Sequence, residues 1–405
     1  MSILLVTPFV DPQAVGEPRW CYDLAKAISS RTETMIVAQS PRKRSYSVAD
    51  LFPEAQVFEH RPWEMDYLPK RIHALIKPNY MLFYHHARKA IRRARAAGAI
   101  SCAHHFGPLA LRYPTPLRGM GIPYIFGPLG GSLPTPPAFN GGQGSQPWYY
   151  RLRDFDGMRF RYDPWLRSSY QDAACVVGVA DYVRDVLSPM KLRDFASFPE
   201  IAARPPEADV DALVAQRAKR TGPVRFLIVS RLIFSKGVHF AVRAASLLSG
   251  ERDWRIDILG AGPMQAELEA EIASLGLGSR VALHGHVARG TVDEFYRDAD
   301  IFLFPSIREP SGAVVFEAMS WGLPMISADY GGPAAHVCDA FGRRVGVGSE
   351  AGFVDGLADA MRELISAAEV REKMGRAALR AARERHSIDA MASFFLDLYR
   401  RHGRH

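Results

Sequence analysis

Two glutamates near residue 310 form the strongest cluster of side chains that could do chemistry. Glu309 is followed by Pro-Ser-Gly, and a helical pattern that carries Glu317 begins near Gly312. A helix start offers unpaired N–H groups and the positive end of a dipole to a phosphate. Carboxylates accept hydrogen bonds from sugar and ribose hydroxyls. The segment predicts a phosphate site with two hydroxyl acceptors; the alternative is one helix N-terminal charge and one solvated glutamate.

Two cations follow an apolar run at residues 225–230. Arg231 and Lys236 lie between this expected strand and a helix opened by Gly237. Cations at the carboxyl end of a strand can stabilise the charge on a departing diphosphate. Arg and Lys in loops are more often solvated. Because the same half of the chain contains Glu309, we interpret these two as part of the phosphate site.

Other sequence signals argue against a bound cofactor or catalytic metal. The stretch LGAGPM contains Gly260 and Gly262, but Gln265 stands where the dinucleotide fingerprint needs its third glycine. It is better interpreted as a tight turn at a strand end. The sequence has three Asp-x-Asp triplets, none of which follows an apolar strand as a metal site would require. We therefore expect no cofactor and no essential metal.

From about residue 222 to residue 340 these motifs resemble, in order and spacing, the nucleotide-binding domain of retaining glycosyltransferase family 4. That family has the two-domain GT-B architecture. The first half of the chain is matched more weakly, although residues 16–24 fall where the family has its glycine loop and first helix. The motif residues are Arg231, Lys236, Gly237, Gly260, Gly262, Pro263, Glu309, Glu317, Gly322, Pro324, Gly331 and Gly332.

The resemblance implies a role for each matched residue. Arg231 and Lys236 would hold the diphosphate of a nucleotide-sugar donor, and Glu317 would bind its ribose. Glu309 would contact the donor sugar near the reacting centre, which makes Glu309, Lys236 and Arg231 the expected catalytic residues. The remaining expected donor contacts are Gly16, Gly262, Ser311, Gly312 and Ala313.

The chain departs from the family pattern in its first half and after its Gly-Gly turn. A single glycine, Gly16, precedes Glu17 where the family has a pair, and Ala335 precedes His336 where it usually has a glutamate. A glycine-rich stretch replaces the family's N-terminal histidine. We expect the acceptor or sugar side to include His104, His105, Gly130 and Gly131; for the histidines the alternative is a buried structural role.

Short apolar runs alternate with helical patterns, which predicts parallel sheets with crossover helices. Together with the resemblance, this gives an α/β fold of GT-B architecture, with two Rossmann-like domains whose sheets face across a cleft. Each sheet is expected to have about five strands. The expected strands are 3–7, 34–38, 99–104, 123–126 and 175–179 in the first half, and 225–230, 255–260, 280–284, 301–305 and 324–328 in the second.

Proline and glycine clusters suggest the domain boundaries. We expect an acceptor-side domain over residues 1–200 and a nucleotide-sugar-binding domain over residues 223–385. Residues 201–222 would link them, because they contain a Pro-Pro pair and close with Gly-Pro. A C-terminal helix over residues 386–405 would pack back on the first domain. Residues 132–150 would form either a surface loop or a mobile substrate loop.

The excess positive charge lies in the first half. The net charge is +8; residues 1–200 contain 25 basic and 17 acidic residues, whereas the remainder contains 26 of each. The span Lys70–Arg95 has eight cations and no acid, and within it Arg88, Arg92 and Arg95 share one helical face. This face is either simply solvated or docks on an anionic membrane, which we favour. No nucleic-acid-binding module is recognised.

These observations predict a bacterial, metal-independent retaining hexosyltransferase that uses a UDP- or GDP-sugar. Its acceptor would be a hydroxyl of a glycan or lipid-linked glycan of an exopolysaccharide, capsule or lipopolysaccharide. Scattered cysteines and no apolar run of 18 residues favour a cytoplasmic protein, peripheral on the inner face of the cytoplasmic membrane. The alternatives are a sugar-nucleotide epimerase of the same fold and a non-catalytic sugar-nucleotide-binding or membrane-scaffold protein.

Overall fold

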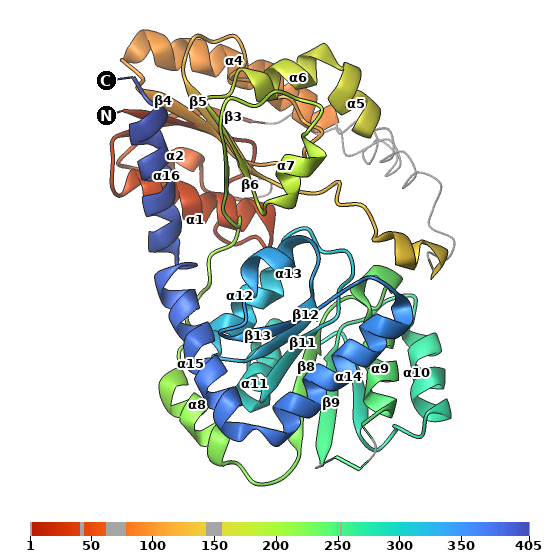
Figure 1. Cartoon of the computed structure of the whole chain (residues 1–405). Helices are drawn as coiled ribbons and strands as arrows, with labels where there is room; N and C mark the ends of the chain where they lie inside the picture. Colours follow the sequence, from red (N-terminus) through yellow and green to blue (C-terminus); the bar gives the residue numbers. More distant parts are fainter. Residues whose placement is uncertain are drawn as a thin grey trace. The chain divides into compact units, whose positions relative to one another are not determined.

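The computed structural model forms two compact units, each built on a parallel β-sheet (Figure 1). It describes residues 2–40, 44–61, 78–142, 156–248, 250–251 and 253–404. Unit 1 comprises residues 1–132, 146–200 and 388–405, and unit 2 comprises residues 133–145 and 201–387. Each unit therefore contains segments that are far apart in the sequence.

The sheet of unit 1 has seven strands within the described residues, in the order β3-β2-β1-β4-β5-β6-β7. All neighbouring strands are parallel. The order reverses between β1 and β4, as in doubly wound folds. The strands are β1 (Ile3–Thr7), β2 (Thr34–Gln39), β3 (Gln56–His60), β4 (Cys102–His105), β5 (Tyr124–Leu129), β6 (Cys175–Gly178) and β7 (Phe195–Ser197).

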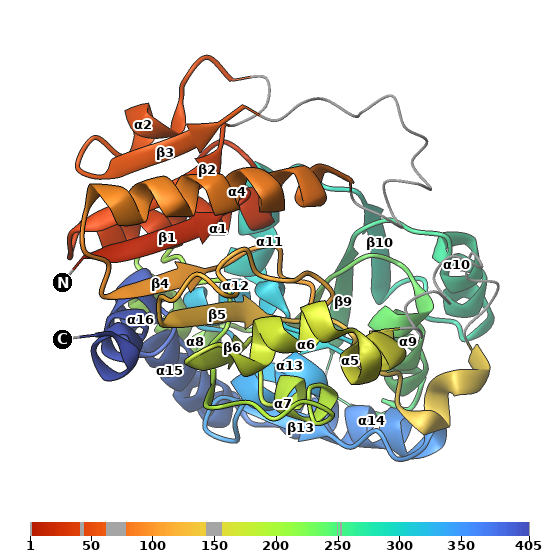
Figure 2. The same cartoon turned by 90° about the horizontal axis from the view of Figure 1, so that it is seen from above.

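The helices of unit 1 pack on this sheet and on one another. Helix α4 lies along β2 and β3, and α16 packs against α1 (Figures 1 and 2). The helices are α1 (Glu17–Ser29), α2 (Val48–Leu51), α4 (Pro78–Ala97), α5 (Asp156–Tyr162), α6 (Pro164–Gln171), α7 (Tyr182–Val186) and α16 (Ile388–His402).

The sheet of unit 2 has six parallel strands within the described part of the chain, in the order β10-β9-β8-β11-β12-β13. Again the order reverses, here between β8 and β11. The strands are β8 (Val224–Val229), β9 (Trp254–Leu259), β10 (Val281–Gly285), β11 (Ile301–Phe304), β12 (Met325–Ala328) and β13 (Gly342–Val345).

Helices of unit 2 also pack in pairs, α9 with α14 and α8 with α15. The helices and 3-10 turns are η1 (Pro137–Gly142), α8 (Val210–Lys219), η3 (Phe234–Lys236), α9 (Val238–Ser246), α10 (Gln265–Ser274), α11 (Arg289–Asp298), α12 (Ala313–Ser320), α13 (Gly331–His336), α14 (Glu350–Ser366) and α15 (Ala368–Glu384).

The predicted fold class, two α/β domains with parallel sheets, is confirmed, and every expected strand has a counterpart within a few residues. The prediction of five strands per sheet missed β3, β7 and β13. All three lie at sheet edges, where one side of the strand faces solvent. Strand β13 reads Gly-Arg-Arg-Val, so it lacks the apolar run used to recognise the buried strands.

The predicted linker is instead an integral part of unit 2. Helix α8, inside the expected linker 201–222, buries Val210 and Val214 and packs against α15. Arg217 is also buried and donates hydrogen bonds to the carbonyl oxygens of Trp321 (2.7 Å) and Tyr296 (2.9 Å). This guanidinium satisfies carbonyls that would otherwise be buried without partners. The sequence of α8 was too polar to indicate that one face of this helix is buried.

The segment after residue 132 also differs from expectation. Residues 133–145 group with unit 2 rather than with the predicted first domain. One contribution comes from Phe139 in η1, which is fully buried and whose ring lies 5.3 Å from that of Phe240 and 5.8 Å from that of Phe353. The described part of this Pro- and Gly-rich segment is therefore packed; residues 143–150 lie outside the described residues.

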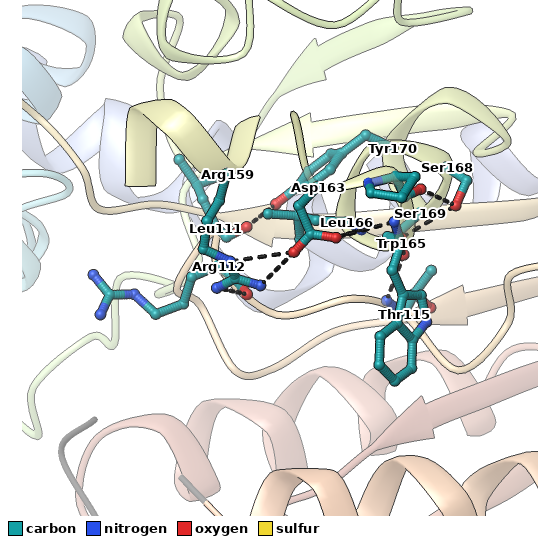
Figure 3. A network of polar contacts seen from close by, with 11 residues as sticks. Leu111, Arg112, Thr115, Arg159, Asp163, Trp165, Leu166, Ser168, Ser169 and Tyr170 are labelled. Atoms are coloured by element: carbon teal, nitrogen blue, oxygen red, sulfur yellow. Dashed lines mark hydrogen bonds and ion pairs between the residues drawn. The ribbon is translucent and has the colours of Figure 1, made fainter. Parts of the chain in front are cut away.

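A polar network joins α5 and α6 to the loop that follows β4 (Figure 3). The Asp163 carboxylate caps α6 by accepting hydrogen bonds from the backbone of Trp165 and Leu166, both at 3.0 Å, and pairs with Arg159 at 2.9 Å. The Tyr170 hydroxyl donates to the Leu111 carbonyl. These contacts hold α5 and α6 against the loop that follows β4.

None of the helices in the described ranges has the length and apolarity needed to cross a membrane.

Helix α4 contains the described part of the predicted basic span, since residues 70–77 lie outside the described residues. The Arg88 guanidinium donates to the carbonyl oxygens of Pro116 and Arg118, and that of Arg95 donates to Met120. Two of the three arginines expected on a solvated face therefore brace a neighbouring loop.

Candidate functional site

Two loops meet at the carboxyl ends of β8 and β11, which are neighbouring strands in unit 2. The first loop, residues 230–237, carries Arg231 and Lys236. The second, residues 305–312, carries Glu309. The loops are joined because the Arg308 amide (3.3 Å) and the Ser306 hydroxyl (3.2 Å) both donate to the Ser235 carbonyl. This edge is where ligands bind in open α/β sheets.

An ion pair between Lys236 and Glu309 connects the two loops. Each side chain is 15% exposed, and the Lys236 ammonium also lies 5.9 Å from the centre of the Phe304 ring. Partial burial strengthens the attraction between the charges but makes either charge costly without a partner. The sequence predicted both residues at this site; the structure shows that they neutralise each other.

Helix α12 begins beside this ion pair. Its N-cap residue is Gly312, with φ of 90°, and glycine has no side chain that could accept from the first amides of the helix. Ser311 and Gly312 are buried, and Ala313 is the first helical residue. The amides at this helix start carry positive partial charge next to the Lys236 ammonium. The arrangement suits an anion such as a phosphate.

A glycine turn supports the second loop from behind. The Gly332 amide donates to the Glu309 carbonyl at 2.9 Å. A Cβ on Gly332 would lie 2.5 Å from the Ser311 carbonyl oxygen, closer than any side chain can approach. The Gly-Gly pair noted in the sequence therefore lets the backbone of α13 pack directly against the loop that carries Glu309.

Glu317 has a different set of partners from Glu309. It lies on α12, where its carboxylate accepts a hydrogen bond from the Tyr296 hydroxyl at 3.1 Å and lies 3.7 Å from the Arg289 guanidinium. Burial raises the pKa of Glu317, whereas Arg289 and the Tyr296 hydroxyl lower it. The two glutamates are thus held separately, each beside a cation from another element.

Arg289 and Tyr296 were missed by the sequence analysis. Both lie on α11, seven residues apart, which places them on the same helical face. That spacing was available as a signal, but nothing in the sequence indicates that α11 packs beside α12. Only the tertiary structure brings this face to Glu317.

The other residues predicted in unit 2 line the first loop. Arg231, the second residue after β8, is exposed. Gly262 packs against that loop, since a Cβ there would lie 2.3 Å from the Leu232 carbonyl oxygen. The Leu232 amide donates to Ala261 and the Leu232 carbonyl accepts from Met264, both at 3.1 Å. These contacts agree with a tight turn at the end of β9.

The remaining expected residues belong to unit 1. Gly16 is the N-cap of α1, with φ of 79°, and no described atom lies within 4 Å of a Cβ placed there. The Gly130 amide donates to the Leu109 carbonyl at 2.7 Å, and the Gly131 amide donates to the Tyr182 hydroxyl at 3.0 Å. Gly130 and Gly131 thus stand in a hydrogen-bonded turn after β5.

The histidine pair lies inside the core of unit 1 rather than beyond the strand end. His104 and His105 are the last residues of β4, with exposed fractions of 0% and 1%. The two ring nitrogens of His104 contact the Tyr399 hydroxyl and the Gly127 carbonyl, the latter at 2.6 Å. Burial lowers the pKa of each histidine to about 3, so both are neutral. The structure therefore supports the buried structural alternative.

The second half of the chain is similar to a known protein family. Residues 209–381 match the family described as Glycosyl transferases group 1. This span contains both loops, α11, α12 and the Gly-Gly turn. The match thus covers most of unit 2 and lies outside unit 1.

Three relatives illustrate the similarity. The alpha-D-kanosaminyltransferase of Streptomyces kanamyceticus is 28% identical over 49% of this chain and 51% of its own length. The amylovoran biosynthesis glycosyltransferase AmsK of Erwinia amylovora is 32% identical over 27% of this chain and 29% of its own. The solved structure of Anabaena HepE in complex with UDP has a TM-score of 0.61 at 17% identity, covering 99% of this chain and 100% of that one.

The sequence matches span about half or less of the curated relatives, whereas the structural match extends over the whole chain. The two parallel-sheet units have the GT-B fold of these structural neighbours. The chain therefore has the GT-B fold, and residues 209–381 of its second unit are similar to the family described as Glycosyl transferases group 1.

The junction of η3 and α9 provides a test of the site's packing. Gly237 has φ of 67°, and a Cβ there would lie 2.0 Å from the Pro305 carbonyl oxygen. Gly276 has φ of 68° with no described atom within 4 Å of such a Cβ. Gly276→Ala should cost about 1 kcal/mol of unfolding free energy from backbone strain. Gly237→Ala should cost several times more because the two loops must separate; equal losses in urea denaturation would contradict this packing.

Proposed function

We propose that this chain is a retaining glycosyltransferase that moves a sugar from a nucleoside-diphosphate donor to a hydroxyl of a glycan or lipid-linked glycan. The observation that carries the proposal is the Lys236–Glu309 ion pair at the start of α12. It offers a cation and helix amides to a diphosphate, and a carboxylate to the sugar next to it. The family match over residues 209–381 supports the same assignment.

In the proposed reaction the donor replaces the internal ion pair with two external interactions. The Lys236 ammonium turns to the diphosphate, together with Arg231 and the amides of Gly312 and Ala313. The Glu309 carboxylate then accepts hydrogen bonds from the donor sugar. As the glycosidic bond breaks, negative charge accumulates on the leaving diphosphate, where preorganised positive groups stabilise it most.

The acceptor hydroxyl attacks from the face that the diphosphate leaves, which retains the anomeric configuration. The leaving phosphate oxygen takes the proton of that hydroxyl. Glu317 binds the ribose hydroxyls, and Arg289 and Tyr296 hold its carboxylate in place. Since Lys236, Arg231 and the helix amides supply the positive charge, the proposed reaction uses no metal ion.

The donor we propose is a UDP- or GDP-sugar, with a hexose as the transferred group. Anabaena HepE was solved with UDP, which favours a uridine nucleotide. The acceptor we propose is part of a bacterial surface polysaccharide, in line with the name of the amylovoran relative. An epimerase would convert the donor without an acceptor, and a binding protein would leave it unchanged.

Replacing Lys236 by Ala should reduce sugar transfer by about 100-fold or more, the usual effect of removing one group that stabilises the departing charge. The matched control is Arg243→Ala on α9, which removes a cation paired with Glu271 outside the site. Donor consumption should be measured with UDP-, GDP- and ADP-sugars, with and without a glycan acceptor. Equal turnover in both variants would refute the role of Lys236, and turnover without acceptor would favour the epimerase.

We further propose that unit 1 docks on an anionic membrane to reach a lipid-linked acceptor, as a peripheral protein of the inner face of the cytoplasmic membrane. On α4 the side chains of Lys89, Arg92 and Arg93 are exposed. Each cation near an anionic surface contributes about 1 kcal/mol. Because Arg88 and Arg95 hydrogen-bond to carbonyls, these three residues would make the larger contribution.

Replacing Lys89, Arg92 and Arg93 together by Gln should remove about 3 kcal/mol, which is about 100-fold in vesicle partitioning. A matched control replaces three exposed cations of unit 2, Lys219, Arg255 and Lys373. Flotation with vesicles of neutral or anionic lipid measures the effect. Equal recovery with both lipids, or equal losses in the two variants, would contradict the proposal.

A further inference from the structure

Three potential metal ligands converge in unit 1, whereas the donor motifs of residues 231–332 lie in unit 2. The Cys175 thiol, the Asp194 carboxylate and the His402 imidazole each offer an atom, and these atoms lie within 4.8 Å of one another. Cys175 is the first residue of β6, Asp194 directly precedes β7, and His402 is the last residue of α16. A three-element cluster of this kind is not needed by the proposed transfer reaction.

His402 makes no hydrogen bond to the nearby Asp194 carboxylate. Its Nε2 lies 3.0 Å from an Asp194 carboxylate oxygen, but the contact does not have hydrogen-bond geometry. Within the described part of the chain this buried nitrogen has no hydrogen-bond partner. The Cys175 thiol makes a 3.6 Å contact with the carbonyl of the next residue, at the length of a weak sulfur hydrogen bond. The His402 Nε2 atom is therefore left without a hydrogen bond, next to the thiol and the carboxylate.

Sulfur, imidazole nitrogen and carboxylate oxygen together are a zinc ligand set. Zinc bonds of about 2.0–2.3 Å in a tetrahedron place the ligand atoms about 3.5 Å apart. The three atoms here lie within 4.8 Å of one another, so small side-chain shifts would bring them to that spacing. Since Asp194 is exposed, water can complete the fourth position. We propose that Cys175, Asp194 and His402 bind a zinc ion that fastens the C-terminal end of α16 to the sheet of unit 1.

The position of the cluster indicates a structural rather than a catalytic ion. Cys175 opens β6, so the cluster lies at the amino end of this strand, whereas ligands of open α/β sheets bind at the carboxyl ends. Helix α16 starts at Ile388, directly after the last residue of unit 2, and belongs to unit 1. An ion at His402 would therefore anchor the far end of the helix with which the chain returns to unit 1.

The test uses the full chain, stripped with a chelator, loaded with zinc and dialysed. We expect about one zinc ion per chain by elemental analysis, a higher melting temperature, and a thiolate-to-metal band when Co²⁺ replaces zinc. Cys175→Ser should abolish the band and zinc retention, and His402→Ala should weaken retention at least about 10-fold. Cys338→Ser, which changes a partly exposed cysteine of unit 2, is the matched control.

Failure of wild-type protein to retain zinc, or equal retention by the wild type and by both ligand variants, would overturn the proposal. If Cys175→Ser does not fold, His402→Ala decides the question, since this side chain lies at the end of a helix and is not part of the buried core. Donor turnover should continue in chelator at a temperature where the stripped protein is folded. Loss of turnover under that condition would contradict the structural role of the ion.

Discussion

The candidate site depends on one partly buried ion pair, Lys236 with Glu309, which joins the loops after β8 and β11. Because both charges are shielded from water, neither can be left without a partner at low cost. A donor that offers a diphosphate to the lysine and hydroxyls to the glutamate satisfies both charges at once. The pair thus holds the loops together in the free protein and matches the polarity of the proposed donor.

The backbone around this pair is fixed by close approach rather than by long side chains. Gly237 leaves room for the Pro305 carbonyl, and Gly332 leaves room for the Ser311 carbonyl. The start of α12 is consequently held beside Lys236, with Gly312 as an N-cap that has no side chain to bond the first amides of the helix. Rigid placement of positive groups before the reaction is what makes electrostatic stabilisation of a leaving group effective.

The sequence was sufficient for the fold class and for the loops of unit 2, because apolar runs and glycine spacings are local signals. It could not reveal that His104 and His105 are buried, since the helix that covers His104 with Phe395 and Tyr399 comes about 290 residues later. Arg289 and Tyr296 were missed for the same reason: their contact with Glu317 depends on the packing of α11 beside α12. Nor did the polar sequence of α8 indicate the buried Arg217.

The grouping of residues 133–145 with unit 2 was likewise not a local signal, because it depends on long-range contacts such as that of Phe139 with Phe240. The C-terminal helix was expected to pack on the first domain, and α16 belongs to unit 1. The meeting of His402 with Cys175 and Asp194 was not predicted. Those three residues are widely separated in the sequence and form no spacing motif. The sequence expectation of no metal concerned the transfer reaction, and a zinc ion at this cluster would be structural.

A crystal structure of the chain with bound UDP would show where the diphosphate lies. If the donor binds at the start of α12, diphosphate oxygens should lie about 2.7–3.2 Å from Lys236 Nζ and from the amides of Gly312 or Ala313, with the ribose hydroxyls at Glu317. A diphosphate bound away from the start of α12, with Lys236 still paired to Glu309, would contradict the proposed donor site.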